Sequence, residues 1–155
     1  MLILRPLAED DFASFGTILR SVPGRRIAYP ETTEPGDKPG KAVFSIATHQ
    51  PVETHGSLML LERHPYSNQS FLPLDSGRWM VAVAPATAEG LPDLERLVAF
   101  VAGPADAVCI HKGVWHAPMT VFDRPADMAM LMWRTHAGDD TEELALPSPV
   151  AFQLP

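Results

Sequence analysis

Short runs of apolar or alternating residues, each ended by a turn-forming residue, make up most of this sequence. Alternation of apolar and polar side chains with a period of two is typical of half-buried β-strands, and Pro, Gly, Asp and Asn commonly end them. The pattern predicts strands over residues 42–48, 57–62, 69–74, 79–84, 97–101, 107–110, 118–122 and 127–134. So many short strands favour a sandwich, a barrel or a jelly roll.

A single helix is predicted, over residues 8–15. Three acidic residues stand in its first turn, where the helix dipole favours negative charge, and Phe12 and Phe15 lie on one face before Gly16 supplies a stop. The chain contains 16 prolines, about twice the average share, and proline breaks helix interiors. A helical bundle is therefore disfavoured.

Two segments lie outside the predicted elements. Residues 25–41 are polar, rich in Pro and Gly and too long for a tight turn, so they form either a mobile loop over a site or plain surface. The tail after Arg134 carries an acidic cluster, which is typical of a solvated face.

The size and charge of the chain narrow the classes of protein it can be. Its 155 residues, 46% of them hydrophobic, suit one domain over residues 1–155 with a core of its own. The formal net charge of −7 makes nucleic acid a poor candidate partner, because phosphates are recognised mainly through basic patches. Cys109 cannot form an internal disulfide, and no signal peptide or membrane-spanning run is present, so we expect a cytoplasmic protein without a membrane partner.

Five polar side chains on this apolar scaffold could form one site. Glu62 and His64 stand two residues apart on a predicted strand, so they share a face. Gln69 opens the next strand after a tight connection, and antiparallel pairing would bring it beside them. Farther along, His111 and His116 flank a glycine that permits a tight bend. Histidine changes charge near neutral pH and is the commonest metal ligand, so the group indicates a catalytic or metal-binding site.

Each of these residues also has a purely structural interpretation. His64 or His116 alone could be a buried histidine that is merely hydrogen-bonded, and only the joint pattern favours a site. Phe71 and Trp115 are expected in the core or the pocket wall, since an aromatic ring offers packing area rather than acid–base chemistry. Cys109 stands in the apolar run AVCI, where a buried thiol is inert.

Two stretches resemble the sequence motifs of the cupin superfamily. The first motif is matched, with its final glycine one residue late, by Gly56, Glu62, His64, Gln69 and Gly77. The later motif is matched more loosely by His111, Gly113, His116 and Thr120. More specifically, the phrases LERHPYSNQSFLPL, VAVAP followed by PDLERLVAFVAG, and HKGVWHAP resemble those of the bacterial ureidoglycolate lyases, as does the opening LRPLAEDDFASFGTIL.

This resemblance implies an all-β fold, the cupin double-stranded β-helix or jelly-roll barrel with a short N-terminal helix, and a homodimer. It also implies the cleavage of ureidoglycolate to glyoxylate and urea in allantoin and purine catabolism. The cleaved carbon bears a hydroxyl, a carboxylate and a ureido nitrogen, so the reaction needs a base for the hydroxyl proton and an acid for the departing nitrogen. His64 and His116 suit these roles in an order that the sequence leaves open, and Glu62 would orient or assist one of them.

Further residues are expected around the substrate under the same resemblance. Lys112 is the first candidate for the substrate carboxylate, and its rivals are three cations of the polar segment: Arg25, Arg26 and Lys41. The full set expected to bind the substrate comprises Gln69, His111, Lys112, Phe71 and Trp115.

A bound metal and a metal-free site are both consistent with these residues. Metal-binding cupins usually present three histidines and a glutamate, whereas the equivalent positions here are Glu62, His64, Gln69 and His116. Two histidines and a carboxylate can hold a divalent ion, but an amide is a weak fourth ligand. The family resemblance implies nickel, and a bound ion would polarise the developing carbonyl as a Lewis acid.

Three other functions stay open at this point. A hydrolase acting on the same substrate would release ammonia instead of urea. A metal-dependent cupin oxygenase would consume oxygen and lose activity under chelation. A non-enzymatic cupin would only bind a metabolite, although this chain lacks the length and basic charge of a DNA-binding regulator.

Overall fold

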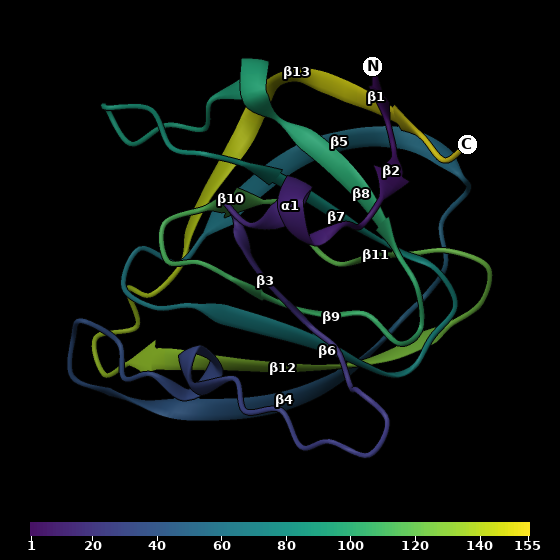
Figure 1. Ribbon diagram of the computed structural model, residues 1–155. Helices are drawn as coiled ribbons and strands as arrows, with labels where there is room; N and C mark the ends of the chain where they lie inside the picture. Colours follow the sequence, from purple (N-terminus) through teal and green to yellow (C-terminus); the bar gives the residue numbers. More distant parts are fainter.

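Thirteen β-strands form two sheets that face each other across a shared interior (Figure 1). The computed structural model describes residues 1–155. The larger sheet has eight strands in the order β1 (Leu2–Ile3), β13 (Glu142–Gln153), β5 (His55–Arg63), β10 (Trp115–His116), β7 (Trp79–Ala84), β8 (Val98–Ala102) and β2 (Arg5–Pro6), with β11 (Thr120–Val121) paired to β7. The smaller sheet has the order β3 (Gly16–Leu19), β9 (Ala107–Ile110), β6 (Gln69–Asp75), β12 (Ala126–Thr135) and β4 (Gly40–His49).

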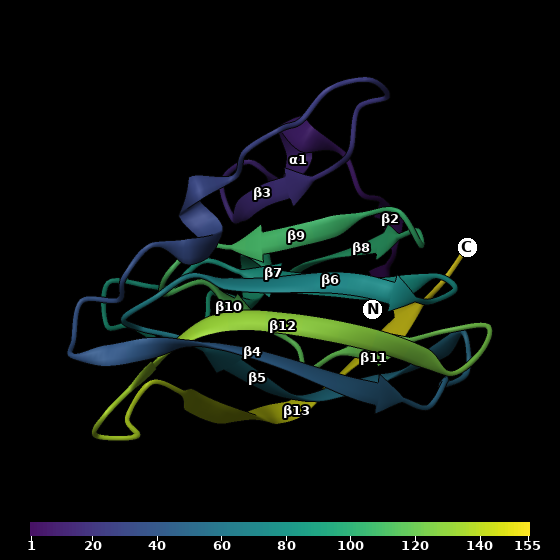
Figure 2. The ribbon, with the colours of Figure 1, turned by 90° about the horizontal axis from the view of Figure 1, so that it is seen from below.

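The chain passes repeatedly between the two sheets. β4, β6, β9 and β12 belong to the smaller sheet, and the strands that follow each of them, β5, β7, β10 and β13, belong to the larger one. Figure 2 shows β6, β12 and β4 as neighbours in one layer, with β5 and β13 in the other. This crossing is that of a jelly-roll barrel, and it lets residues far apart in the sequence line one interior.

Strand β7 explains how the core is divided. All six of its side chains are buried, and they alternate between two apolar clusters. Trp79, Val81 and Val83 enter the cluster between the sheets, which also holds Phe100 and Val108. The other three enter a second cluster on the outer side of the larger sheet, closed by both chain ends through side chains such as those of Leu4, Phe152 and Leu154.

All eight predicted strands are present, and the predicted all-β barrel is confirmed. The helix is shorter than expected: α1 covers Glu9–Phe12, because the chain turns after Phe12 and Gly16 already opens a strand that pairs with β9. Two short 3₁₀ helices, η1 (Pro30–Thr33) and η2 (Leu94–Arg96), complete the secondary structure. None of these helices has the length and apolar character needed to cross a bilayer.

The tail after Arg134 is mostly exposed, as its acidic cluster indicated, but it also forms a strand that the pattern did not predict. The tail forms β13, the longest strand, which pairs with β5 along most of its length. Its register shifts between Ala145 and Val150, where Pro147 and Pro149 fall, because proline is tolerated in a sheet mainly at edges and bulges. Leu144 and Val150 are partly buried against the second cluster, as residues on the inner face of a strand would be. The sequence did not reveal this strand because acidic residues stand at its start.

Candidate active site

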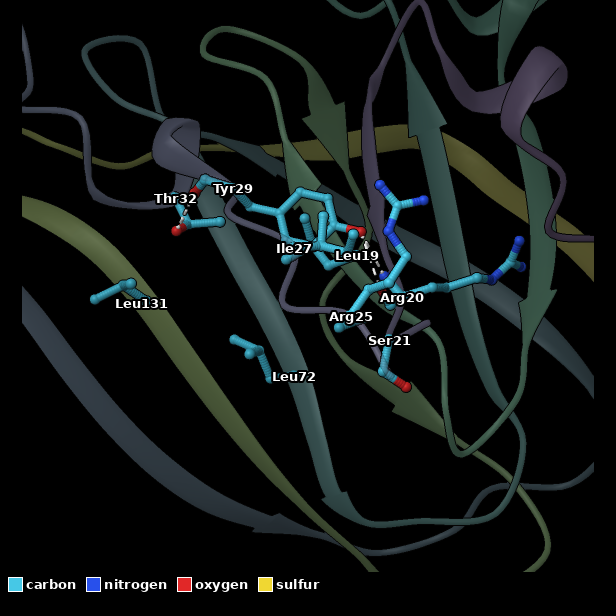
Figure 3. Close-up of a pocket in the computed structure, with 10 residues that line it drawn as sticks. Leu19, Arg20, Ser21, Arg25, Ile27, Tyr29, Thr32, Leu72 and Leu131 are labelled. Carbon is cyan, nitrogen blue, oxygen red and sulfur yellow. Dashed lines mark hydrogen bonds between the residues drawn. The ribbon is translucent and has the colours of Figure 1, made fainter. Parts of the chain in front are cut away.

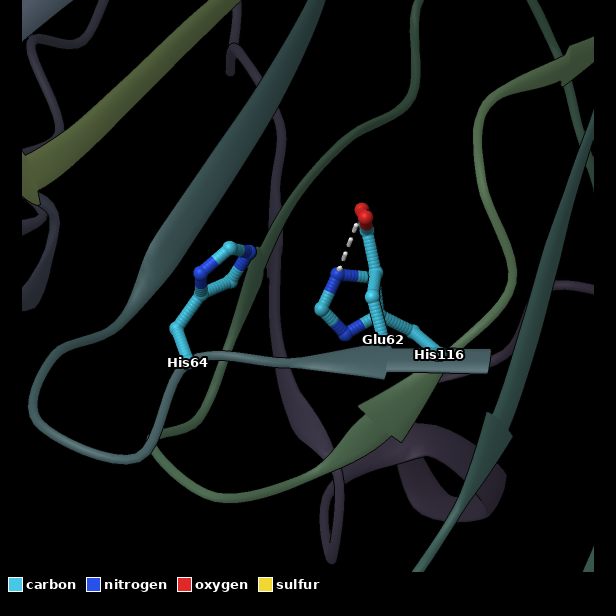
Figure 4. Close-up of side chains that lie close together, drawn as sticks. All are labelled: Glu62, His64 and His116. Atoms are coloured by element: carbon cyan, nitrogen blue, oxygen red, sulfur yellow. Dashed lines mark ion pairs between the residues drawn. The ribbon is translucent and has the colours of Figure 1, made fainter. Parts of the chain in front are cut away.

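Glu62, His64 and His116 come together between the two sheets (Figure 4). Glu62 lies near the end of β5 and His64 directly follows that strand, and their side chains share the orientation that their spacing predicts. β10 pairs with β5 so that His116 is the direct partner of Glu62 across the ladder. Their nearest imidazole and carboxylate atoms all lie within 4.8 Å of one another, and the two imidazole rings are 5.3 Å apart between centroids.

Both ring nitrogens of His116 face hydrogen-bond acceptors. Nδ1 lies 3.1 Å from the carbonyl oxygen of Val114, and Nε2 lies 3.0 Å from Oε1 of Gln69 and 3.5 Å from Oε1 of Glu62. Carbonyl and carboxylate oxygens only accept, so each ring nitrogen is placed to donate when it carries a proton. The hydrogen bond from His116 in turn holds the pKa of the Glu62 carboxyl below its ordinary value, which keeps this carboxylate ionised.

His64 is arranged in the opposite way. Its Nδ1 donates to the carbonyl oxygen of Asp140 at 2.9 Å, while its Nε2 is buried and has no hydrogen-bond partner. Burial, followed by the nearby positive charge of His116, lowers the pKa of the His64 imidazole below its ordinary value. His64 is therefore neutral near pH 7 and offers a free lone pair at Nε2, an unpaired buried group of the kind that functional sites retain.

A cavity of about 770 Å³ opens beside this cluster. Both sheets contribute to its wall, through Lys41, Val43, Ser45, Glu62, His64, Gln69, Met130, Met132, Arg134, Thr141 and Glu143. His116 does not belong to that wall, because only 1% of it is exposed and it lies behind Glu62 and Gln69. Phe71, also buried, packs edge-on against the His116 ring with centroids 6.0 Å apart and so holds it in place.

Four of the five expected substrate-binding residues do not line this cavity: Lys112, His111, Trp115 and Phe71, which packs behind it against His116. Lys112 pairs with Asp37 at 2.7 Å on the exterior. His111 borders a different, smaller cavity beside α1, because Gly113 turns the chain with a positive φ of 79°. Trp115 precedes His116 on the same strand, so alternation sends its ring to the outer cluster, where Nε1 donates to the carbonyl oxygen of Gly90.

The cavity also contains residues that the sequence pattern did not single out. Met130, Met132 and Arg134 alternate along β12 and share its inner face, a signal that was present in the predicted strand. Thr141 and Glu143 lie on or beside β13, which was not expected as a strand. Lys41, expected only as a rival of Lys112, lies in the wall because β4 begins at Gly40.

A second cavity of about 410 Å³ lies outside the barrel (Figure 3). Leu72 and Leu131 line it. Both point away from the barrel interior, because the residue next to each of them on its strand points inward. Tyr29 closes its other side, and the Tyr29 hydroxyl donates to the carbonyl oxygen of Arg20 at 2.9 Å. No histidine or acidic residue lines this cavity, so it lacks the acid–base groups of the first.

The three-residue cluster fits a divalent metal ion. Two imidazole nitrogens and a carboxylate are a donor set that first-row transition metals accept, and Nε2 of His64 already presents an unpaired lone pair. Gln69 is engaged with His116 through its oxygen, so Glu62, His64 and His116 are the residues that would hold the ion. A bound ion would supply Lewis-acid polarisation of an oxygen of the substrate.

Comparisons with known proteins agree with this architecture. Residues 1–153 match the family described as ureidoglycolate lyase. The chain is 30% identical to the ureidoglycolate lyase of Chelativorans sp. strain BNC1, over 99% of this chain and 97% of that protein, and 28% identical to that of Pseudomonas fluorescens Pf-5, over 92% and 89%. A dTDP sugar isomerase from Desulfovibrio desulfuricans G20 superposes with a TM-score of 0.52 at 18% identity, covering 86% of this chain and 84% of that one, a likeness that concerns the fold alone.

Proposed function

The chain belongs to the ureidoglycolate lyase family, and from that premise we propose that His64 and the His116–Glu62 pair carry out the proton transfers of its reaction. The enzyme is a lyase that cleaves ureidoglycolate to glyoxylate and urea. We assign this reaction to allantoin degradation. The observation that carries the proposed roles is the buried, unpaired Nε2 of His64 next to an imidazole surrounded by acceptors.

The reaction moves two protons and breaks one bond. The hydroxyl of ureidoglycolate loses its proton, and the electron pair of the oxygen forms the carbonyl of glyoxylate. The bond from carbon to the ureido nitrogen breaks, and this nitrogen takes up a proton as urea leaves. Water is not consumed, so the site needs a base and an acid on either side of one carbon.

His64 is the base in this proposal. It borders the cavity, and its Nδ1 is held by the Asp140 carbonyl oxygen, so the lone pair at Nε2 is fixed in direction. Burial favours the neutral form of its imidazole, which is the form that accepts a proton. Because Nε2 is buried, the cavity wall has to shift slightly before the substrate hydroxyl can reach it.

The His116–Glu62 pair is the acid. His116 is too deeply buried to reach the substrate itself, whereas the Glu62 side chain is 21% exposed and borders the cavity. We assign His116 as the holder of the proton at Nε2 and Glu62 as the member that passes it to the departing nitrogen. The proton gained by His64 then returns to the pair, which lies within the same cluster of atoms.

A divalent metal, with nickel as the ion to test first, is the second form of this site. The same three residues would hold it, and their protons would have to be released on binding. The acid–base route is favoured here because the acceptors around His116 suit a proton at Nε2.

Product analysis tests the proposed function directly. Metal-stripped protein and protein reloaded with nickel are each incubated with ureidoglycolate, and urea, glyoxylate, ammonia and oxygen uptake are measured separately. Equal amounts of urea and glyoxylate from both preparations support the acid–base lyase. Turnover that appears only with nickel contradicts the metal-free route, release of ammonia indicates the hydrolase, oxygen uptake indicates an oxygenase, and binding without turnover indicates a metabolite-binding cupin.

We also propose that the protein acts in the cytoplasm, where the buried free thiol of Cys109 stays reduced.

We further propose that two copies of the chain associate through β4. β4 is an edge strand that pairs only with β12, along ten residues without a bulge. It exposes Phe44 and Ile46, each 59% accessible, and such an unprotected edge is a template for another strand. Antiparallel pairing with β4 of a second copy would extend the sheet and cover both side chains.

A further inference from the structure

The geometry points to a carboxylate-binding subsite formed by Lys41 and Arg134, on the wall of the cavity opposite Glu62. This inference rests on the proposed function, because it assigns the place of the substrate's carboxylate within the same cavity. Both side chains belong to the cavity wall, and both come from the smaller sheet, Lys41 from β4 and Arg134 from β12.

The two cations are direct partners across the ladder between β4 and β12. Like charges placed directly opposite each other destabilise a sheet, so a fold retains such a pair at a cost unless an anion lies between them. The chain has three lysines, and two of them are neutralised, Lys38 by Asp139 and Lys112 by Asp37. Lys41 forms no ion pair.

Arg134 is only partly neutralised. Its Nε lies 3.2 Å from Oδ2 of Asp140, a buried carboxylate that also accepts from Thr135. Its terminal nitrogens have no oxygen partner, and Nη1 approaches the sulfur of Met132, another residue of the cavity wall, at 3.8 Å. Asp140 thus partly neutralises the guanidinium through a single contact at Nε that lacks hydrogen-bond geometry, and the terminal nitrogens stay available to bind a carboxylate.

The facing sheet presents the opposite charge. Glu62 and Glu143 are partners across the ladder between β5 and β13, and both belong to the cavity wall. The cavity is therefore bipolar, with cations on the smaller sheet and carboxylates on the larger one. A molecule with a carboxylate at one end and N–H donors at the other fits in one orientation, with its ureido group at Glu62 and its hydroxyl-bearing carbon between the walls, beside His64.

The experiment compares the wild type with Lys41→Met, a change of similar shape that removes the charge of an exposed residue. We expect KM for ureidoglycolate to rise about tenfold while kcat stays within about twofold, since the carboxylate, although bonded to the reacting carbon, keeps its charge throughout and is held about equally in the ground and transition states. Lys38→Met, which changes a half-exposed lysine three positions away and outside the cavity, is the matched control and should leave KM unchanged. Arg134→Lys, which keeps the charge but loses the fork, should raise KM to a smaller extent.

A binding measurement makes the result independent of turnover. Metal-stripped protein is heated with glycolate, a small hydroxy acid anion, or with its neutral amide, glycolamide. Glycolate should raise the Tm of the wild type and of Lys38→Met, and this shift should be lost in Lys41→Met, whereas glycolamide should have little effect on any of them. An unchanged KM in Lys41→Met, an equal shift with glycolamide, or a rise of KM in Lys112→Met instead would overturn the subsite.

The two proposals fail in different ways. If wild-type protein releases urea and glyoxylate but Lys41→Met matches it in KM, the lyase reaction stands and the subsite is refuted. If the wild type releases neither product while glycolate binding depends on Lys41, the subsite stands and the reaction is refuted.

Discussion

Replacing His64 by Asn separates the catalytic nitrogen of this residue from its structural one. The Asn side chain places an N–H donor near the position of Nδ1, so the hydrogen bond to the Asp140 carbonyl oxygen can be kept. The atom that disappears is Nε2, the buried nitrogen without a partner. In the proposed reaction, loss of this base lowers kcat by about 10²- to 10⁴-fold, the usual contribution of a positioned general base.

The effect on stability is expected to be small, because two changes oppose each other. Removing an unpaired buried polar atom relieves a cost of about 1–3 kcal/mol. Losing part of the ring, which packs at 5.3 Å from His116, leaves a void and costs a similar amount. The free energy of unfolding should therefore stay within about 1 kcal/mol of the wild type.

The assay pairs the release of urea and glyoxylate with denaturant unfolding of the same preparations. His64→Ala is the informative comparison, because it also leaves the Asp140 carbonyl oxygen without its donor and should lower both activity and stability. A kcat within tenfold of the wild type in His64→Asn would remove His64 from the role of base. A large loss of stability in that variant would show that Nε2 has a partner in solution.

Three further changes probe the acid, the surface charge and the edge strand. His116→Ala should abolish measurable turnover and, because it leaves a buried void and removes the donor to Gln69, lower the free energy of unfolding by about 2–4 kcal/mol; retained activity would exclude the assigned acid. Arg78 lowers the pKa of Asp123 to about 2, so Asp123→Asn should cost under about 1 kcal/mol near neutral pH, because the pair is half-exposed. Since the folded-state pKa is depressed, that difference is present above the ordinary value of 3.8 and should vanish as the pH falls toward about 2; a constant difference in unfolding experiments across this range would contradict the pairing. Phe44→Lys should convert a dimer to a monomer in sedimentation measurements without loss of the fold, and an unchanged mass would place the interface elsewhere.

The strands were predictable because alternation is a local property of the sequence, and the shared orientation of Glu62 and His64 followed from it. The tail was not, because its alternation begins among acidic residues and is interrupted where the register of β13 shifts. The subsite residues Lys41 and Arg134 are neighbours only through the pairing of β4 with β12, strands that 76 residues separate at their closest ends. Nothing in either strand alone indicates that pairing.

Lys112 illustrates the opposite error, in which proximity along the chain was mistaken for proximity in space. It stands four residues before His116, yet the turn at Gly113 separates the two, and the Lys112 ammonium pairs with Asp37 outside the barrel.

The register of the two-residue strand β10 determines which of its side chains enters the site. Its partner Glu62 faces His116, so Trp115 must face the outer cluster. A shift of one residue in this pairing would exchange the two rings, placing an indole beside Glu62 and the acid outside the barrel. Packing on both sides of the sheet opposes that shift. Trp115 is only 3% exposed in the second cluster, and His116 packs on Phe71, which belongs to the cluster between the sheets. The packing of the barrel, rather than the short strand itself, therefore keeps the proton donor next to the cavity.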